Sequence, residues 1–403
     1  MDLPLRGVRV LDLTHRLAGP TLTMMLGDWG ADVLKVEWWE RMDAWRGMIS
    51  VKHDTHGDQT YNKLPKWLKL NRNKRGITLN LKTEKGKQLF RGLARRSDVV
   101  ADNFSAGVLD RLGLGYDALS EINPRIIVIS MPGFGNDGPD ARFVANGSTI
   151  EGYAGLASIT GYAGESPRNT MGIWPDPVAG MHGAVAIGMA LMRRESTGRG
   201  QYIELSQAET LVNMIGEAVL EYAANGTVAG PAGNSDPEMA PHGTYPGRGE
   251  DRWITIAVAT DGEWTALCEV AGNPTWAGAG EFATAEGRRA HSETLDALIG
   301  DWTREHDIWE LAERLQHAGV AAGPVVTMED FNDRPDIPSR RFEQHLEGGY
   351  IDRYPGPAAR LDGTEPAVRS PAPRLGEHTR EVLSELLQLP AAELDRLEAE
   401  GVI

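Results

Sequence analysis

The sequence predicts an α/β fold, in which a mostly parallel sheet forms a large domain and a smaller α/β domain follows. Short β-branched runs alternate with helix-length segments through the first half of the chain, and this alternation is typical of βαβ units. The chain also has 403 residues, which is too long for one ordinary hydrophobic core and favours two domains.

The elements of the first half follow from periodicity and from turn residues. Apolar, β-branched runs predict strands at residues 8–13, 32–37, 78–81, 99–103, 125–130 and 202–205. We expect helices at residues 20–29, with Pro20 at the first position, at 83–96 and at 178–192. The loop after the first strand reads THRLAGP and lacks the GxGxxG fingerprint. The sequence therefore gives no support for a nicotinamide or flavin site there.

The second half contains two stretches without periodicity, which we interpret as connections between domains. Between and after them, strands are expected at 253–258 and 322–326 and helices at 263–271, 292–304, 308–318, 379–387 and 391–401. The predicted organisation is a large domain over residues 1–222 that is completed by 375–403, a linker and active-site loop over 223–249, a small domain over 250–330 and a return linker over 331–374. Because connections inside a compact domain are usually about 4–6 residues long, linkers of this length favour a dimer in which they lie against a partner chain.

Composition excludes several classes of partner. The net charge is −16 with a pI near 5.1, and no long basic run offsets it, so neither nucleic acid nor an anionic membrane is an expected partner. Cys268 is the single cysteine, which rules out an intrachain disulfide. The N-terminus carries no apolar signal region, and no uninterrupted apolar stretch could span a bilayer. We therefore expect a cytoplasmic protein.

Asp176 is the strongest candidate for a catalytic residue. It lies between Pro175 and Pro177, just before the uncharged segment predicted as a buried helix. A helix N-terminus has unpaired N–H groups and a partial positive charge, so it would hold this carboxylate ionised. The alternative is a simple helix N-cap, for which Asp is a favoured residue.

Motifs along the whole chain resemble those of one family. The segment after Asp176 contains GMHG, a helix of small residues and the turn RRESTGRGQ. Other motifs follow in the family's order: GVRVLDLTHRLAGP, LGDWGADVLKVE, NRNKRGITLNLKTEKG, ADNFSAGVLDRLG, INPRIIVISMPGFG, AGVAAGPV and LGEHTREVLSELL. Together they resemble the class III CoA-transferases of the CaiB/BaiF type, which include formyl-CoA transferase and carnitine CoA-transferase.

The resemblance implies a fold, a reaction and a set of contacts. It implies a Rossmann-like large domain and a homodimer whose two chains are interlocked rings. Asp176 would attack an acyl-CoA donor, form an aspartyl-CoA thioester and pass CoA to a carboxylic acid acceptor. CoA is then a substrate, and no permanent cofactor or metal is expected. The family positions that contact CoA correspond to His15, Arg16, Leu79, Lys82, Asn103, Phe104 and Arg111. Gly172 and Gly180 are candidates for the donors that stabilise the oxyanion.

Departures from the family pattern bear on the substrate. Leu17 stands where formyl-CoA transferases have glutamine, Trp38 and Trp39 stand where they have arginine, and the tetraglycine loop of the small domain is missing. These departures favour an acid bulkier than formate or oxalate, with Trp45 and Trp174 as further candidates to line its pocket.

Three alternative functions remain open at this point. An α-methylacyl-CoA racemase would need a histidine in the segment 142–147, which reads RFVANG. An isomerase that transfers CoA within one molecule would use the same aspartate. A non-catalytic acyl-CoA-binding subunit is the alternative of a different class. His53 and His56 are not accompanied by a metal-ligand pattern and are expected to be exposed.

Overall fold

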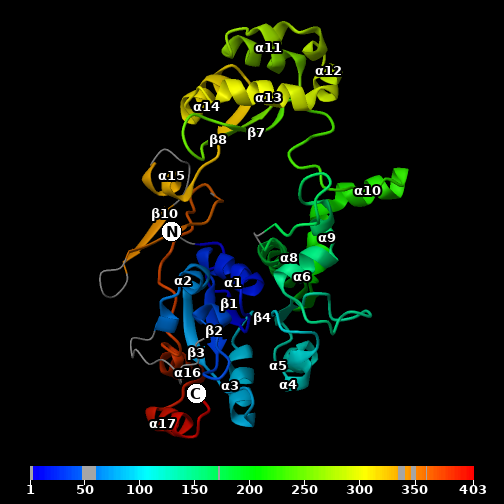
Figure 1. The fold of residues 1–403 in the computed structure, drawn as a ribbon. Helices are drawn as coiled ribbons and strands as arrows, with labels where there is room; N and C mark the ends of the chain where they lie inside the picture. Colours follow the sequence, from blue (N-terminus) through cyan, green and yellow to red (C-terminus); the bar gives the residue numbers. More distant parts are fainter. Residues whose placement is uncertain (1–2, 48–59, 171–172, 335–340, 346–350, 360) are drawn as a thin grey trace. The chain divides into compact units, whose positions relative to one another are not determined.

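The computed structural model covers the full chain and describes residues 3–47, 60–170, 173–334, 341–345, 351–359 and 361–403. The chain divides into two compact units. The first comprises Met1–Ala157, Asn169–Val228 and Ser339–Ile403, and the second comprises Ser158–Arg168 and Ala229–Pro338. The C-terminal segment thus returns to the first unit, where its helices, red in Figure 1, pack on the blue and cyan elements.

The first unit is built on a six-stranded parallel sheet with the strand order β3-β2-β1-β4-β5-β6. Its strands are β1 (Arg9–Asp12), β2 (Asp32–Glu37), β3 (Lys74–Thr78), β4 (Val99–Asp102), β5 (Ile127–Ser130) and β6 (Tyr202–Glu204). All five pairings between neighbouring strands are parallel. The carboxyl ends of the strands therefore lie along one edge of the sheet, where ligands of open α/β sheets bind.

Helices cover both faces of this sheet. Helices α1 (Ala18–Asp28) and α8 (Pro175–Thr197) pack on the face formed by Val10, Val33 and Ala101. Helices α3 (Glu84–Ala94), α5 (Tyr116–Ile122), α16 (Thr379–Leu387) and α17 (Ala391–Ala399) pack on the opposite face. Because helices cover both faces, the central strands are mostly apolar, as is usual in parallel sheets, although β1, β2 and β3 also carry buried charged residues.

The remaining elements of the first unit are short. They are the helices α2 (Pro65–Asn71), α4 (Val108–Leu112), α6 (Gly147–Tyr153), α9 (Gln207–Val212) and α10 (Gly216–Asn225), and the hairpin strands β10 (Arg341–His345) and β11 (Ile351–Pro355). Helix α7 (Leu156–Ile159) lies where the chain passes between the units.

The second unit has its own sheet and core. Strands β7 (His242–Pro246), β8 (Trp253–Ala257) and β9 (Ala321–Pro324) form an antiparallel sheet, green to yellow in Figure 1. The helices are α11 (Asp261–Val270), α12 (Ala285–Ala290), α13 (Ser292–Thr303), α14 (Ile308–His317) and α15 (Met328–Asp333). A separate apolar cluster that includes Trp264, Phe282 and Leu311 fills the space between the sheet and its helices.

The observed elements differ from the predicted ones in several places. The third strand lies at Lys74–Thr78 rather than 78–81, because its buried Lys74 and half-buried Arg75 hide the strand pattern. Helix α1 begins at Ala18, so Pro20 is its third residue. The range 223–249 contains β7, the range 331–374 contains the β10–β11 hairpin, and residues 158–168 belong to the second unit. The Pro and Gly residues that flank these short strands obscure them in the sequence.

Of the helices that the structure describes, none combines the length and the apolar character needed to cross a membrane.

Candidate active site at Asp176

The carboxylate of Asp176 lies between the N-terminal turns of two helices. Asp176 is in the first turn of α8, whose N-cap is Trp174. Pro175 and Pro177 have no N–H group, so this end of α8 offers the carboxylate few donors. The carboxylate interacts with two backbone N–H groups, that of Ala18 at the start of α1 and that of Asp176 itself.

The carboxylate is largely buried, and its Oδ2 atom has no hydrogen-bond partner among the described residues. Burial raises the pKa of Asp176 to about 6, although the Ala18 N–H and the charge of Arg16 act in the opposite direction. The backbone N–H groups at the helix N-termini favour the ionised form, but desolvation outweighs them, so the net pKa lies above its usual range. The group is still mainly ionised at neutral pH, and an unpaired anionic oxygen is a reactive one.

A glycine and a second carboxylate form the wall behind Asp176. An added Cβ at Gly147, the first residue of α6, would lie 1.9 Å from Ile173 Cγ2 and 2.6 Å from Asp176 Oδ2, so only glycine leaves room for these two side chains. Glu151, one turn later and only 1% exposed, accepts hydrogen bonds from the N–H of Thr170 at 2.9 Å and of Trp174 at 3.2 Å. Helix α6 therefore fixes the segment that leads into Asp176.

Strained backbone lies on both sides of the carboxylate. Ile173 has a φ of 50° and Arg16 a φ of 65°, both in the left-handed region. This conformation is a genuine outlier for a β-branched residue such as isoleucine. Strain of this kind is retained where the surrounding structure holds it, and it is most common at functional sites.

A buried ionic network supports the loop from Thr14 to Leu17. Asp43 accepts hydrogen bonds from the backbone N–H of Arg16 at 3.1 and 3.2 Å, and the Lys35 ammonium donates to the carbonyl oxygen of Thr14. Lys35 and Asp43 are themselves 3.5 Å apart. The network holds three carboxylates and three cations, all buried: Asp12, Glu37, Asp43, Lys35, Arg46 and Lys74. Because the charges balance, the loop is held by paired rather than isolated buried charges.

Three of the predicted CoA contacts lie together at the carboxyl edge of the sheet. The side chain of Asn103 accepts a hydrogen bond from the His15 N–H at 2.7 Å and donates one to the His15 carbonyl oxygen at 2.8 Å. The rings of His15 and Phe104 are 5.7 Å apart. Burial, and then the charge of Lys35, lowers the pKa of His15 below its usual range. The imidazole is therefore neutral near pH 7.

The other predicted contacts differ in exposure. The Leu79 side chain is 1% exposed and belongs to the core, so only its backbone is available to a ligand. Lys82 is exposed and its ammonium lies 2.8 Å from a Glu40 oxygen. Arg111 is exposed on α4 and donates to the Ala106 carbonyl oxygen at 3.1 Å.

Of the two glycines that are candidates for oxyanion donors, the structure describes Gly180. Gly180 lies inside α8, and an added Cβ there would lie 2.8 Å from the Ala18 carbonyl oxygen, so this glycine permits the close approach of α8 to α1. Gly172, His53 and His56 lie outside the described residues. Within the described ranges, no three His, Cys, Asp or Glu side chains gather closely enough to hold a metal ion.

Several residues of the site were not found from the sequence. Lys35 and Lys74 could have been found, because each lies inside a strand of a parallel sheet that has helices on both faces. A lysine in that position must be buried and paired with an acidic residue. Nothing in the sequence indicated Gly147 or Glu151, since their proximity to Asp176 depends on how α6 packs beside α8.

Comparisons with known proteins identify the family of this chain. Residues 5–379 match the family model described as CoA-transferase family III. The chain is 33% identical to the succinyl-CoA–L-malate CoA-transferase beta subunit of Chloroflexus aurantiacus, over 100% of this chain and 98% of that protein. It is also 33% identical to the formyl-CoA:oxalate CoA-transferase of Streptomyces avermitilis, over the full length of both. A solved structure of a CaiB/BaiF family protein from Brucella suis has a TM-score of 0.84 and 32% identity, and it covers 96% of this chain and 100% of that one. The chain belongs to CoA-transferase family III and is an enzyme of that class.

Proposed function

We propose that this enzyme transfers CoA from an acyl-CoA thioester to a carboxylic acid through a covalent aspartyl-CoA intermediate on Asp176. The observation that carries the proposal is the buried Oδ2 atom of Asp176, which has no hydrogen-bond partner in the described part of the chain. A carboxylate that is desolvated yet mainly ionised at neutral pH is suited to nucleophilic attack.

The reaction comprises two exchanges. An oxygen of Asp176 attacks the thioester carbonyl, the C–S bond breaks, and CoA leaves as a thiolate from a mixed anhydride. The thiolate attacks the aspartyl carbonyl of that anhydride, so the donor acid leaves as a carboxylate and the aspartyl-CoA thioester remains. The acceptor carboxylate then reverses both steps and regenerates Asp176. No proton is consumed overall, so these steps need no general base.

The α1 N-terminus supplies the groups that would stabilise negative charge in these steps. The Ala18 N–H already donates to the Asp176 carboxylate, and the charge of Arg16 acts on it as well. Donors that are fixed before the reaction stabilise a developing oxyanion without further reorganisation. The ionic network below the loop is what fixes them.

We place CoA along the carboxyl edge of the sheet, on loops that follow β1, β3 and β4. His15, Arg16, Asn103 and Phe104 would contact the part of CoA that leads to the thioester. Lys82 and Arg111 would meet its phosphates, and Leu79 would contribute backbone atoms. These residues bring exposed cations to a protein with a net charge of −16, where an anionic ligand needs local compensation.

The acceptor in this proposal is an acid bulkier than formate or oxalate. Trp174, two residues before Asp176, is 48% exposed and provides an apolar surface next to the carboxylate. Trp39 is exposed after the carboxyl end of β2. Trp45 is half-buried, and the Lys66 ammonium lies 4.0 Å from its ring centroid, so this tryptophan has a structural contact of its own.

The experiment that tests the proposal traps the intermediate. The enzyme is incubated with succinyl-CoA as a probe donor and no acceptor, treated with hydroxylamine and digested for mass spectrometry. The expected result is a hydroxamate on Asp176, which is absent in Asp176→Asn and present in the control Asp362→Asn. An adduct on Cys268, whose buried thiol has a pKa raised to about 11, would contradict the proposal. So would transfer activity in Asp176→Asn close to that of the unmodified enzyme.

We further propose an interlocked homodimer, supported by an exposed apolar stripe on α8. Met181, Val185, Met189 and Met192 recur at helical spacing on the side of α8 that does not pack on the sheet, and all four are exposed. A contiguous apolar surface of this kind marks an interface. Mass photometry at nanomolar concentration should report about twice the chain mass, whereas a folded monomer would refute the interlocked arrangement.

A further inference from the structure

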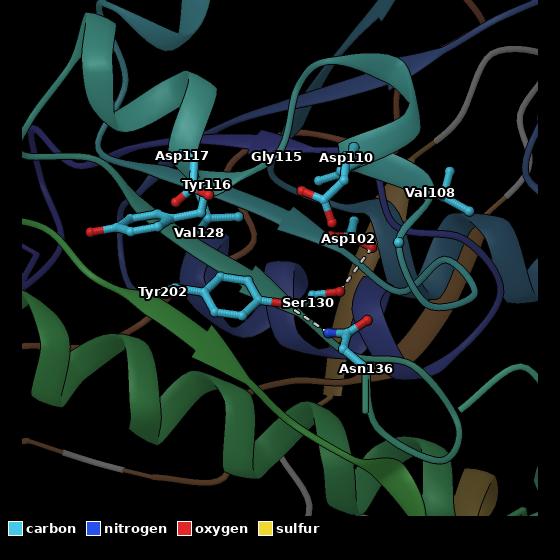
Figure 2. Close-up of a pocket in the computed structure, with 12 residues that line it drawn as sticks. Asp102, Val108, Asp110, Gly115, Tyr116, Asp117, Val128, Ser130, Asn136 and Tyr202 are labelled. Atoms are coloured by element: carbon cyan, nitrogen blue, oxygen red, sulfur yellow. Dashed lines mark hydrogen bonds between the residues drawn. The ribbon is translucent and has the colours of Figure 1, made fainter. Parts of the chain in front are cut away.

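A cavity lies in the first unit beside the loop that carries Asn103 and Phe104. It has a volume of about 300 Å³ and lies at the carboxyl ends of β4 and β5 and the first residue of β6 (Figure 2). Its polar lining includes Asp102, Ser130 and Tyr202 from the strands and Asp110 and Tyr116 from α4 and α5. Neither Asp176 nor any of the proposed CoA contacts lines this cavity.

Asp102 presents an unsatisfied carboxylate to the cavity. The side chain is 2% exposed, and its Oδ1 atom accepts hydrogen bonds from the Phe104 N–H at 3.0 Å and from Ser130 Oγ at 3.4 Å. The Oδ2 atom is buried and has no partner in the described part of the protein. A buried charge without a partner is costly, so a group that donates a hydrogen bond to Oδ2 would be strongly favoured.

The lining carries negative charge and no positive charge. Figure 2 shows the Asp110 carboxylate pointing toward Asp102, and Asp117 also lines the cavity. Asp110 can turn inward because Gly115 has no side chain, and an added Cβ there would overlap its carboxylate. Burial, with a further contribution from Asp110, raises the pKa of Asp102 to about 7. No lysine or arginine of the described ranges lines the cavity.

Two tyrosines provide an apolar surface beside these carboxylates. The rings of Tyr116 and Tyr202 are 5.8 Å apart, and Asn136 Nδ2 donates to the Tyr202 hydroxyl at 2.7 Å, which fixes the ring (Figure 2). Aromatic faces beside carboxylates attract organic cations, through the ring quadrupole and through contact with their carbon atoms.

We propose that this cavity binds a small protonated amine, whose ammonium group donates to Asp102 and Asp110 and whose carbon chain lies against Tyr116 and Tyr202. A compact metal ion fits the lining less well, because within the described ranges no three carboxylates come close enough to ligate one. The amine site is separate from the carboxylate of Asp176 and does not depend on the proposed covalent chemistry.

The test is direct binding to the full-length protein. Isothermal titration at pH 8 uses n-butylammonium as the probe, with n-butanol as its neutral counterpart and ammonium and Mg²⁺ chlorides as inorganic cations. We expect saturable binding of n-butylammonium and none of n-butanol. Asp102→Asn keeps the shape of the side chain but removes its charge, so it should weaken binding about tenfold to a hundredfold.

A matched variant and a second readout keep the test decisive. Asp362→Asn removes an exposed carboxylate elsewhere in the first unit and should leave the affinity unchanged. Thermal denaturation with and without n-butylammonium shows whether each variant is folded, and only the variants that retain Asp102 should gain stability. Equal affinity in Asp102→Asn, tighter binding of Mg²⁺ than of the amine, or no saturable binding of n-butylammonium would each overturn the proposal.

Discussion

Replacing Gly147 with alanine should impair catalysis far more than folding. The added Cβ would lie 1.9 Å from Ile173 Cγ2 and 2.6 Å from Asp176 Oδ2, whereas ordinary van der Waals contact begins near 3.4 Å. The Ile173 side chain must therefore move by roughly 1.5 Å and the carboxylate by roughly 0.8 Å, unless α6 itself shifts. Misplacing a reacting group by about 1 Å costs on the order of a hundredfold in rate. We therefore expect kcat to fall about a hundredfold, which corresponds to roughly 2.7 kcal/mol of activation free energy.

The effect on stability should be much smaller, because two contributions oppose each other. Overpacking at a buried position costs about 1–3 kcal/mol, and the most severe clash here is the one with Ile173 Cγ2 at 1.9 Å. Alanine in place of glycine contributes up to about 1 kcal/mol in the opposite direction, a value that belongs to helix interiors and is an upper bound at this first helical position. Thermal denaturation should therefore show a modest decrease in Tm.

Gly152→Ala is the matched control for this prediction. Gly152 is in the same helix, and an added Cβ there meets no atom within 4 Å. The assay measures CoA transfer from succinyl-CoA by following the donor and the product thioester by liquid chromatography. The reasoning fails if Gly147→Ala keeps kcat within twofold of the unmodified enzyme, or if Gly152→Ala loses as much activity as Gly147→Ala.

Three further predictions follow from the charges of the first unit. Because Asp176 must be ionised to attack and its pKa is about 6, kcat/KM should rise with pH and level off above pH 7, and a profile that is flat between pH 5 and 7 would contradict this. The folded-state pKa of Asp102, about 7, exceeds the ordinary 3.8, so ionising it costs stability that is lost progressively between about pH 4 and 7. Asp102→Asn should therefore raise the free energy of unfolding at pH 8 by up to roughly 4 kcal/mol, which a higher Tm would reveal. At pH 4 it should have little effect. Arg111→Ala should weaken CoA binding about tenfold to a hundredfold in isothermal titration, and unchanged affinity in both Arg111→Ala and Lys82→Ala would place the phosphates elsewhere.

The sequence was sufficient for the parts of the fold that depend on local pattern. The strand predicted at 32–37 coincides with β2, and the helix predicted at 379–387 coincides with α16, because each is a clear apolar or amphipathic run between turn residues. The predicted helix at 178–192 was too short. Helix α8 starts at Pro175 and continues to Thr197, since proline is well tolerated at a first helical position and the polar last turns carry no apolar signal.

The candidate site was predictable only where one residue is unusual in its own segment. Asp176 could be identified because it is a lone carboxylate beside an uncharged helix. Gly147 is in contact with it in space, yet the two are far apart in the chain, and nothing in a single sequence links them. Asp102 has the same difficulty, because it resembles any polar residue at the end of a strand until its unpaired oxygen is seen.

Three buried aspartates of the first unit show what decides the state of a carboxylate here. Burial acts on all of them in the same direction, toward a higher pKa. At Asp12 the ammonium groups of Lys35 and Lys74 reverse this effect and hold the pKa well below its usual range, so that carboxylate serves the structure. Among the residues that the structure describes, Asp102 and Asp176 have no cation so close, and each keeps one buried oxygen without a hydrogen-bond partner. An oxygen in that state is stabilised when another group supplies a bond, and the bonds that we propose are a covalent one to an acyl carbon at Asp176 and a hydrogen bond donated by a ligand at Asp102. A buried carboxylate oxygen without a hydrogen-bond partner thus supports both the proposed nucleophile and the proposed amine site.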